Sequence, residues 1–333
     1  MVIDREHWEK HFQGYVVYDC AMMDPERTFY VLVEDTPGPH RDPLPRTRFV
    51  FVRAGRPMDE GRFQESEVGH FGFTEMAYSP SAIEFVAVDT AQHVFSYDRN
   101  DARIEGDIPG TITGTNLHSS CTKVVRVGSS IYTVGWPRRV MVRQGINQWA
   151  LVDAGLPIPR RVKSGNQDDL VEAISNYTFH DLHGFSESDM YAVGDAGEIW
   201  QYDGSRWTRC AFPTNEPLRT VTCADDKVYI TTLRGHVWAG RGNAWKLVCD
   251  EERSIPFRDT AWFAGKLWLG CDYGVWTLEG DSLSRDTLPT EVFLVSGRLD
   301  GSPDGKHLLT AGQVGAAMFD GATWNVLWSA DEM

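Results

Sequence analysis

The chain has 333 residues, of which 42% are hydrophobic and 24% charged, and its formal net charge is −15 at pH 7. A chain this acidic repels phosphate backbones, which argues against nucleic acid as a partner. No stretch approaches 18 consecutive apolar residues, so we expect no segment that crosses a bilayer and no membrane partner.

The six cysteines lie at positions 20, 121, 210, 223, 249 and 271 and form no CxxC pair. This spacing gives no support to a zinc ribbon or a thioredoxin-like redox site. Scattered thiols are typical of a reducing compartment, and residues 1–12 lack the apolar core of a signal peptide. We therefore expect a cytoplasmic protein with buried, free cysteines.

The N-terminal half predicts three groups of short strands of uneven length. These groups cover residues 14–66, 67–115 and 116–160. Within the first group, residues 35–48 are rich in Pro and Arg, and we expect a loop there. In the third group, a glycine turn at Gly145 precedes a strand that contains a tryptophan.

An insertion separates the third group from the fourth. Residues 157–177 lengthen the spacing between corresponding strands by about 20 residues. Within this insertion, Asp168–Ser175 is expected to form a short helix. Asp168 or Asp169 would then lie near its N-cap, where a carboxylate accepts hydrogen bonds from free backbone N–H groups.

The C-terminal half repeats one plan four times, over residues 176–215, 216–256, 257–295 and 296–328. Each copy has an apolar strand, a glycine-containing turn, a second strand and another glycine turn. The glycines of the second turn recur at intervals of 38, 38 and 41 residues and are Gly204, Gly242, Gly280 and Gly321. Two of these turns are Asp-Gly dipeptides, which favour hairpins because glycine tolerates φ > 0.

A period near 40 residues with this strand–turn–strand content is typical of β-propeller blades. One four-stranded blade cannot bury both of its faces, whereas neighbouring blades cover one another and few sheet edges stay exposed. The sequence therefore predicts an all-β chain in which residues 1–333 form a single β-propeller domain. We expect seven blades of four antiparallel strands; six is the alternative, because the first blade is irregular.

Two further expectations follow from this architecture. Trp207, Trp245 and Trp324 open the last strand of their blades, and we expect them to pack between blades with the indole N–H near a loop carbonyl. Residues 14–19 and 324–328 are expected to close the propeller by pairing a terminal strand with the blade at the other end of the chain.

The segment HGFSESDMYAVGDAGEIWQYDGSRW, from His183 to Trp207, resembles a repeat of bacterial WD40-like and TolB-like β-propeller proteins. The segment SPDGKHLLTAG, from Ser302 to Gly312, is similar to their blade turns. The resemblance covers the C-terminal half well and the N-terminal half poorly, and it implies a propeller. Some bacterial propellers of this kind accompany secreted toxins as immunity proteins, so the resemblance also implies a toxin as a protein partner.

Motifs for catalysis and metal binding are weak. Asp203 and Gly204 are adjacent, which does not match the spacing of a sialidase Asp box. His180 and His183 lie three residues apart with Asp181 between them, a poor zinc set on a strand; polar residues at a blade entrance are the simpler interpretation. We expect no catalytic residue, metal ligand or cofactor, although groups that converge from separate blades leave no spacing pattern in a sequence.

A cluster of basic residues stands out in this acidic chain. We predict a partner-binding site at Trp136, Arg138, Arg139, Arg160 and Arg161, because guanidinium groups bind carboxylates of an acidic protein segment. Arg143 and Lys163 lie close to them in the sequence. The alternative interpretation is unrelated surface charge.

The sequence favours a non-catalytic protein-binding propeller, and within that class an immunity protein that binds and neutralises a bacterial toxin. One alternative is a hydrolase or lyase that acts on a carbohydrate or small molecule at the mouth of the central channel. Another is a scaffold in a multiprotein assembly. Shifted pKa values in a carboxylate or histidine cluster would favour the enzyme.

Overall fold

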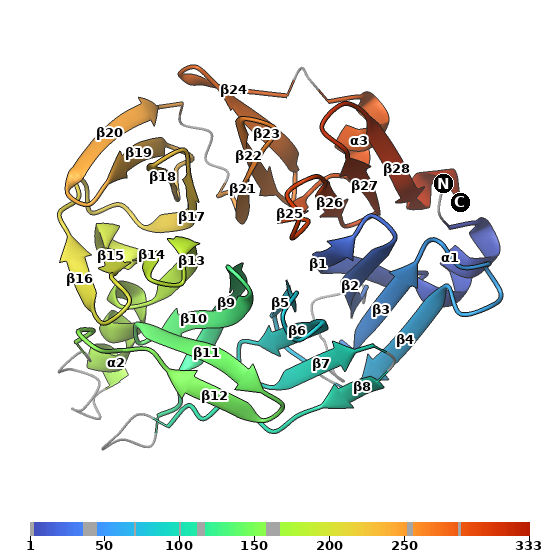
Figure 1. Ribbon diagram of the computed structural model, residues 1–333, viewed down its shortest axis with the longest axis horizontal. Helices are drawn as coiled ribbons and strands as arrows, with labels where there is room; N and C mark the ends of the chain where they lie inside the picture. The colour runs from blue at the N-terminus through green and yellow to red at the C-terminus, as the bar shows by residue number, and fades with distance from the viewer. Residues whose placement is uncertain are drawn as a thin grey trace. The chain divides into compact units, whose positions relative to one another are not determined.

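The computed structural model describes residues 3–35, 45–69, 71–99, 101–111, 117–157, 167–251, 256–285 and 288–333. These residues form seven antiparallel sheets, each of four strands in consecutive order (Figure 1). Each sheet lies within one predicted blade range or extends beyond it by at most two residues, so the seven-blade prediction is confirmed and the six-blade alternative is wrong. By its contacts the chain divides into two compact units: unit 1 is Met1–Tyr78, Arg258–Glu279 and Leu283–Met333, and unit 2 is Ser79–Phe257 and Gly280–Ser282.

The first three sheets come from the N-terminal half of the chain. The first is made of β1 (Tyr15–Asp24), β2 (Arg27–Glu34), β3 (Thr47–Arg53) and β4 (Phe63–Val68). The second is made of β5 (Thr74–Ser79), β6 (Glu84–Asp89), β7 (Val94–Asp98) and β8 (Asp101–Ile104). The third is made of β9 (Ser120–Val127), β10 (Ser130–Trp136), β11 (Arg139–Gly145) and β12 (Gln148–Leu151).

The other four sheets follow in order. The fourth is β13 (Phe179–Ser186), β14 (Asp189–Gly194), β15 (Ile199–Tyr202) and β16 (Trp207–Cys210). The fifth is β17 (Leu218–Ala224), β18 (Lys227–Thr232), β19 (Val237–Arg241) and β20 (Ala244–Cys249). The sixth is β21 (Asp259–Phe263), β22 (Lys266–Cys271), β23 (Gly274–Glu279) and β24 (Ser282–Ser284). The seventh is β25 (Arg298–Gly301), β26 (Leu308–Gly312), β27 (Gly315–Phe319) and β28 (Trp324–Ser329).

Burial falls from the second strand of a sheet to the fourth. Every residue of β6 is buried, and β26 is equally buried. The fourth strands β8 and β12 contain no buried residue: each has two half-buried residues between two exposed ones. Strands covered on both faces are apolar along their length, whereas outer strands face solvent on one side. This gradient explains why the second strands gave the clearest sequence signal.

The predicted tryptophans fill the space between neighbouring sheets. In unit 2, Trp207 is 1% exposed, packs with residues of the third and fourth sheets, and donates its indole N–H to the Val152 carbonyl at 2.9 Å. Trp245 packs between the fourth and fifth sheets. In unit 1, Trp324 packs between the sixth and seventh. The predicted packing role is confirmed for all three.

The glycine turns adopt the expected backbone. Gly204 has φ = +90° and Gly321 has φ = +92°, a region that L side chains rarely enter. In the first of these turns the Asp203 carboxylate accepts hydrogen bonds from the backbone N–H groups of Ser205 and Arg206, both at 2.9 Å. Each Asp-Gly pair therefore stabilises its own hairpin.

The predicted closure by exchange of a terminal strand is wrong. β1 belongs to the first sheet and β28 to the seventh, and each of these sheets takes its strands from one continuous stretch of chain. The ends of the chain meet instead through side chains in unit 1: Ile3 and Phe12 share a hydrophobic cluster with Leu327 and Trp328. Figure 1 shows the N and C labels next to each other.

In the part of the chain that the structure describes, three α-helices accompany the sheets. α2 (Gln167–Asn176) confirms the helix expected at Asp168–Ser175, with Asp168 and Asp169 in its first turn. α1 (Arg5–His11), which is capped by Asp4, and α3 (Thr290–Val295) were not predicted. The described residues also contain two short 3₁₀ segments, η2 (Asp195–Gly197) and η3 (Ala330–Glu332). None of the helices in the described residues is long and apolar enough to span a membrane.

Aspartates on the innermost strands tie neighbouring sheets together. In unit 2, the Asp181 carboxylate accepts hydrogen bonds from its own neighbour Leu182 and from the Val221 N–H of the next sheet, both at 2.8 Å. In unit 1, Asp19 does the same for Cys20 and Met76. Burying such carboxylates is favourable only because backbone donors replace their water shell. These bonds fix the spacing of the inner strands.

Candidate protein-binding site

Arg138, one of the predicted contact residues, is bound to its own chain. Its guanidinium forms two hydrogen bonds of 2.7 Å with the Glu198 carboxylate and a third of 2.9 Å with the Pro157 carbonyl. The side chain is 6% exposed and lies 4.2 Å from the centre of the Tyr177 ring. The pair fixes the turn between β10 and β11 to the strand that begins beside Glu198.

The other predicted contact residues differ from Arg138. Trp136 is 5% exposed. Arg139 is half-buried, donates to the Pro109 carbonyl at 3.1 Å, and forms no ion pair with any described residue. Burial lowers the pKa of Arg139, with a small opposing effect of Asp153. Arg160 and Arg161 lie outside the described residues, as does Lys163, so the contact role of the whole set stays a prediction.

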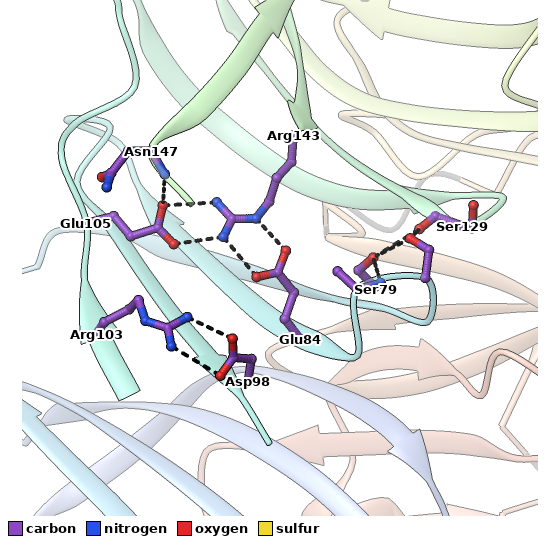
Figure 2. Close-up of polar contacts among 10 residues, drawn as sticks. Ser79, Glu84, Asp98, Arg103, Glu105, Ser129, Arg143 and Asn147 are labelled. Carbon is purple, nitrogen blue, oxygen red and sulfur yellow. Dashed lines mark hydrogen bonds and ion pairs between the residues drawn. The ribbon is translucent and has the colours of Figure 1, made fainter. Parts of the chain in front are cut away.

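Arg143 also finds its carboxylates inside the chain. Figure 2 shows its guanidinium between Glu84 of β6 and Glu105, which follows β8, at distances of 2.6–3.1 Å. The three side chains are 3%, 7% and 0% exposed. Asn147 donates its backbone N–H to Glu105 at 2.7 Å. This triad holds the third sheet against the second in unit 2.

An imidazole–carboxylate pair lies beside Arg138 at the same end of unit 2. His180 Nε2 lies 2.8 Å from Asp195 Oδ1, and the Arg219 guanidinium is 3.5 Å from both ring nitrogens. Backbone bonds connect this pair to the β10–β11 turn: Arg138 N–H donates to the Tyr177 carbonyl, and Asp195 N–H to the adjacent Thr178. We call Arg138, Arg139, His180, Asp195 and Arg219 the polar end of unit 2.

The surroundings of the His180–Asp195 pair show which groups it contacts among the described residues. No serine, threonine or cysteine side chain is hydrogen-bonded to His180 within the described ranges, so the pair has no attached nucleophile there. Nor do those ranges contain a group of three metal-ligating side chains. His183 faces a different partner, because its Nδ1 accepts the Cys223 N–H at 3.2 Å. Burial lowers the pKa of His183 to about 4, which keeps this imidazole neutral.

The sequence drew attention to the arginines but not to the carboxylates that bind them. Glu198 is 60 residues from Arg138, and Glu84 is 59 residues from Arg143, so no local spacing marks these pairs. The inner-strand aspartates, by contrast, could have been found in the sequence, because they recur at equivalent positions of the repeat. Asp181 and Asp259 occupy equivalent positions two repeats apart and each accepts an N–H from the next sheet.

No family model matches the chain. Solved structures match the chain over nearly its whole length. One is the WD40 β-propeller domain of Doa1, which is 12% identical, has a TM-score of 0.58, and is matched over 91% of this chain and 95% of that one. The chain is a seven-bladed β-propeller. YCF48 from Cyanidioschyzon merolae matches the propeller with 12% identity, a TM-score of 0.55 and coverage of 92% and 95%. At these identities the likeness shows the fold alone.

The propeller also has a curated relative. The immune protein Tsi7 of Pseudomonas aeruginosa is 34% identical over 170 residues, which are 50% of this chain and 52% of the relative. The match therefore spans about half the length of each protein.

Proposed function

We propose that this propeller is an immunity protein that binds a bacterial toxin and neutralises it without catalysing a reaction. The observation that carries the proposal is the 34% identity to the immune protein Tsi7. The fold supports it, because a rigid set of sheets presents turns to a partner without rearrangement. The net charge of −15 supports rapid association with a basic partner.

We further propose that the protein acts in the cytoplasm. All six cysteines are free and buried, which suits a compartment that keeps thiols reduced. Fractionation of native cells with an antibody against the chain tests this point. Recovery in a periplasmic or secreted fraction would contradict it.

The proposal is tested by capture followed by rescue. The tagged propeller is cross-linked in its native cells and captured, and the bound proteins are identified by mass spectrometry. Each candidate is then expressed in a host with and without the propeller. We expect one captured protein to stop growth alone and to be tolerated when the propeller is co-expressed. If no captured protein is toxic, or if toxicity persists beside folded propeller, the proposal is wrong.

The predicted arginine site belongs to this proposal. Arg139 has no carboxylate partner in the described part of the chain, so a partner carboxylate is expected to pair with it. Reversal of charge by Arg139→Glu, combined with Arg160→Glu and Arg161→Glu, is expected to weaken toxin binding, measured by calorimetry. Arg206→Glu, at an exposed turn, is the control. Equal affinities for the two variants would remove the arginines from the contact.

A further inference from the structure

A second surface, in unit 1, has the composition of a protein-binding hot spot. Phe73 is 67% exposed and Tyr273 69%, the two largest exposures among the large hydrophobic side chains of the described residues. Clusters of aromatic and arginine side chains dominate the binding energy of protein interfaces. We call Tyr18, Phe73, Arg258, Asp272 and Tyr273 the aromatic–arginine patch.

Contacts join the members of the patch into one surface. The rings of Phe73 and Tyr18 are 5.7 Å apart. The Arg258 guanidinium interacts with the Tyr18 hydroxyl and forms a 2.9 Å ion pair with Asp272, next to Tyr273 in the chain. The Arg258 and Asp272 side chains are 41% and 39% exposed, so a partly exposed ion pair connects Tyr18 with the turn that carries Tyr273.

Carboxylates outnumber cations beneath the patch. Buried Arg298 lies 5.1 Å from the Tyr18 ring centre and pairs with Glu75 at 3.2 Å and Asp259 at 3.7 Å. Two further carboxylates of the inner strands, Asp19 and Asp300, accept backbone N–H groups at 2.7–2.9 Å. Hydrogen bonds of this kind favour the charged form of a carboxylate. The cluster therefore places a net negative charge beside the Tyr18 ring of the patch.

We propose that the aromatic–arginine patch docks a basic segment of the protein partner, one that carries an apolar side chain next to a lysine or arginine. The apolar side chain packs against Phe73 or Tyr273. The cation lies over an exposed ring and near Asp272, where both the ring quadrupole and the carboxylate excess attract it. This inference rests on the proposed function, because it takes the neutralised toxin as the partner.

The first test compares two double variants in the full chain, with the toxin identified by capture and rescue as the probe. Phe73→Ala with Tyr273→Ala is expected to lower toxin affinity about 100-fold, as loss of two hot-spot residues does. The control is Ile104→Ala with Val171→Ala in unit 2, whose side chains are 63% and 59% exposed; its affinity is expected to stay within about threefold of the parent. All three proteins are expected to melt at the same temperature, because each substitution removes an exposed side chain.

The second test identifies the docked segment. A photo-crosslinking phenylalanine analogue in place of Tyr273 is irradiated in the complex, and the linked peptide is sequenced by mass spectrometry. A peptide with lysine or arginine beside an apolar residue supports the inference. An acidic peptide, no cross-link, or equal affinity of the two double variants overturns it while the immunity role stands. If the parent chain itself fails to rescue growth, the proposed function fails, independently of the patch.

Discussion

Arg143 and its two glutamates form a deeply buried ion cluster in unit 2. Desolvation of three charges is costly, and the cluster is favourable only while every oxygen and N–H keeps a partner. The guanidinium supplies four hydrogen bonds, and the Asn147 N–H supplies one more. Loss of the arginine would leave two carboxylates buried beside each other without a cation.

Arg143→Ala is expected to lower the free energy of unfolding by about 3–5 kcal/mol, the usual effect of removing one partner of a buried pair. Arg103 supplies a matched control, because Figure 2 shows it paired with Asp98, and its side chain is 22% exposed against 3% for Arg143. Arg103→Ala is expected to cost at most about 1 kcal/mol. Urea unfolding of both variants measures the difference; equal losses would show that the triad contributes no more than a surface pair.

The same cluster makes the free energy of unfolding depend on pH. Burial acts to raise the pKa of Glu105, but hydrogen bonds from Arg143 and Asn147 outweigh it and hold the pKa below its ordinary value of 4.5. In the parent protein this carboxylate therefore stabilises the fold above about pH 4.5, and the stabilisation is lost as the pH falls through the lowered pKa.

Arg143→Ala is expected to invert this behaviour. Without the guanidinium, burial dominates and raises the pKa of Glu105 above that of the unfolded chain, so protonation stabilises the fold. The deficit in unfolding free energy of Arg143→Ala relative to the parent should then shrink between pH 7 and pH 5. Urea titrations at several pH values measure it; a deficit that grows on acidification would contradict the assignment.

At the scale of single residues, the sequence indicated which arginines were unusual but not which carboxylates they bind. Arg138 and Arg143 stood out because basic residues are sparse in this chain. Their carboxylates lie one blade away along the chain, and the register that brings them together depends on how two sheets pack. The exposed rings of Phe73 and Tyr273 were equally invisible, since an aromatic residue in a turn has no periodic pattern that predicts its exposure.

At the scale of the elements, neighbouring sheets are not joined by a ladder of backbone hydrogen bonds in the described ranges. The aspartates of the inner strands connect them instead, through hydrogen bonds from side chain to backbone. Asp181 satisfies two backbone donors from β13 and β17 at once. The fourth and fifth sheets are thus held by a polar contact at their inner strands and by apolar packing around Trp245 further out. The polar contact is expected to resist sliding of the two sheets past each other, and the apolar packing is expected to resist their separation.

Asp181→Ala is expected to destabilise the protein by about 2–3 kcal/mol, because it leaves buried N–H groups of Leu182 and Val221 without an acceptor. Asp101→Ala is the control, since the Asp101 side chain is 81% exposed and its loss is expected to cost less than about 1 kcal/mol. Thermal unfolding compares the two. Hydrogen exchange at Val221 should also become faster in Asp181→Ala; unchanged exchange would show that the carboxylate does not protect this amide.

The blades were predictable because their signals are local. In the fourth, fifth and seventh sheets, a glycine with φ > 0 in the outer hairpin and a tryptophan in the strand that follows mark the repeat within a few residues. The closure of the propeller was predicted incorrectly because it depends on the two ends of the chain, where Phe12 and Trp328 pack 4.6 Å apart. Phe12 directly follows α1, a helix of seven residues whose amphipathic pattern is too short to distinguish from that of a strand.

At the scale of the whole molecule, the buried cysteines allow a prediction that can be tested without the toxin. Burial raises the pKa of the Cys210 thiol to about 11 and also raises the pKa values of Cys20, Cys223 and Cys271. At pH 8 these thiols stay protonated and covered, and only thiolates react readily. The folded protein should therefore react slowly with an aromatic disulfide reagent, and all six thiols should react after denaturation. Rapid reaction of the folded protein would contradict the burial.

The meeting of Ile3 with the last residues of the chain has a consequence for how such a molecule can be encoded. Met333 packs against the same hydrophobic cluster as Ile3, so a short peptide joining the two ends would cross no sheet. New ends opened at an exposed hairpin such as Gly242–Asn243 would leave every four-stranded sheet with its own strands except the one that is cut. A circular permutant of this chain is therefore expected to keep the strand neighbours of every sheet.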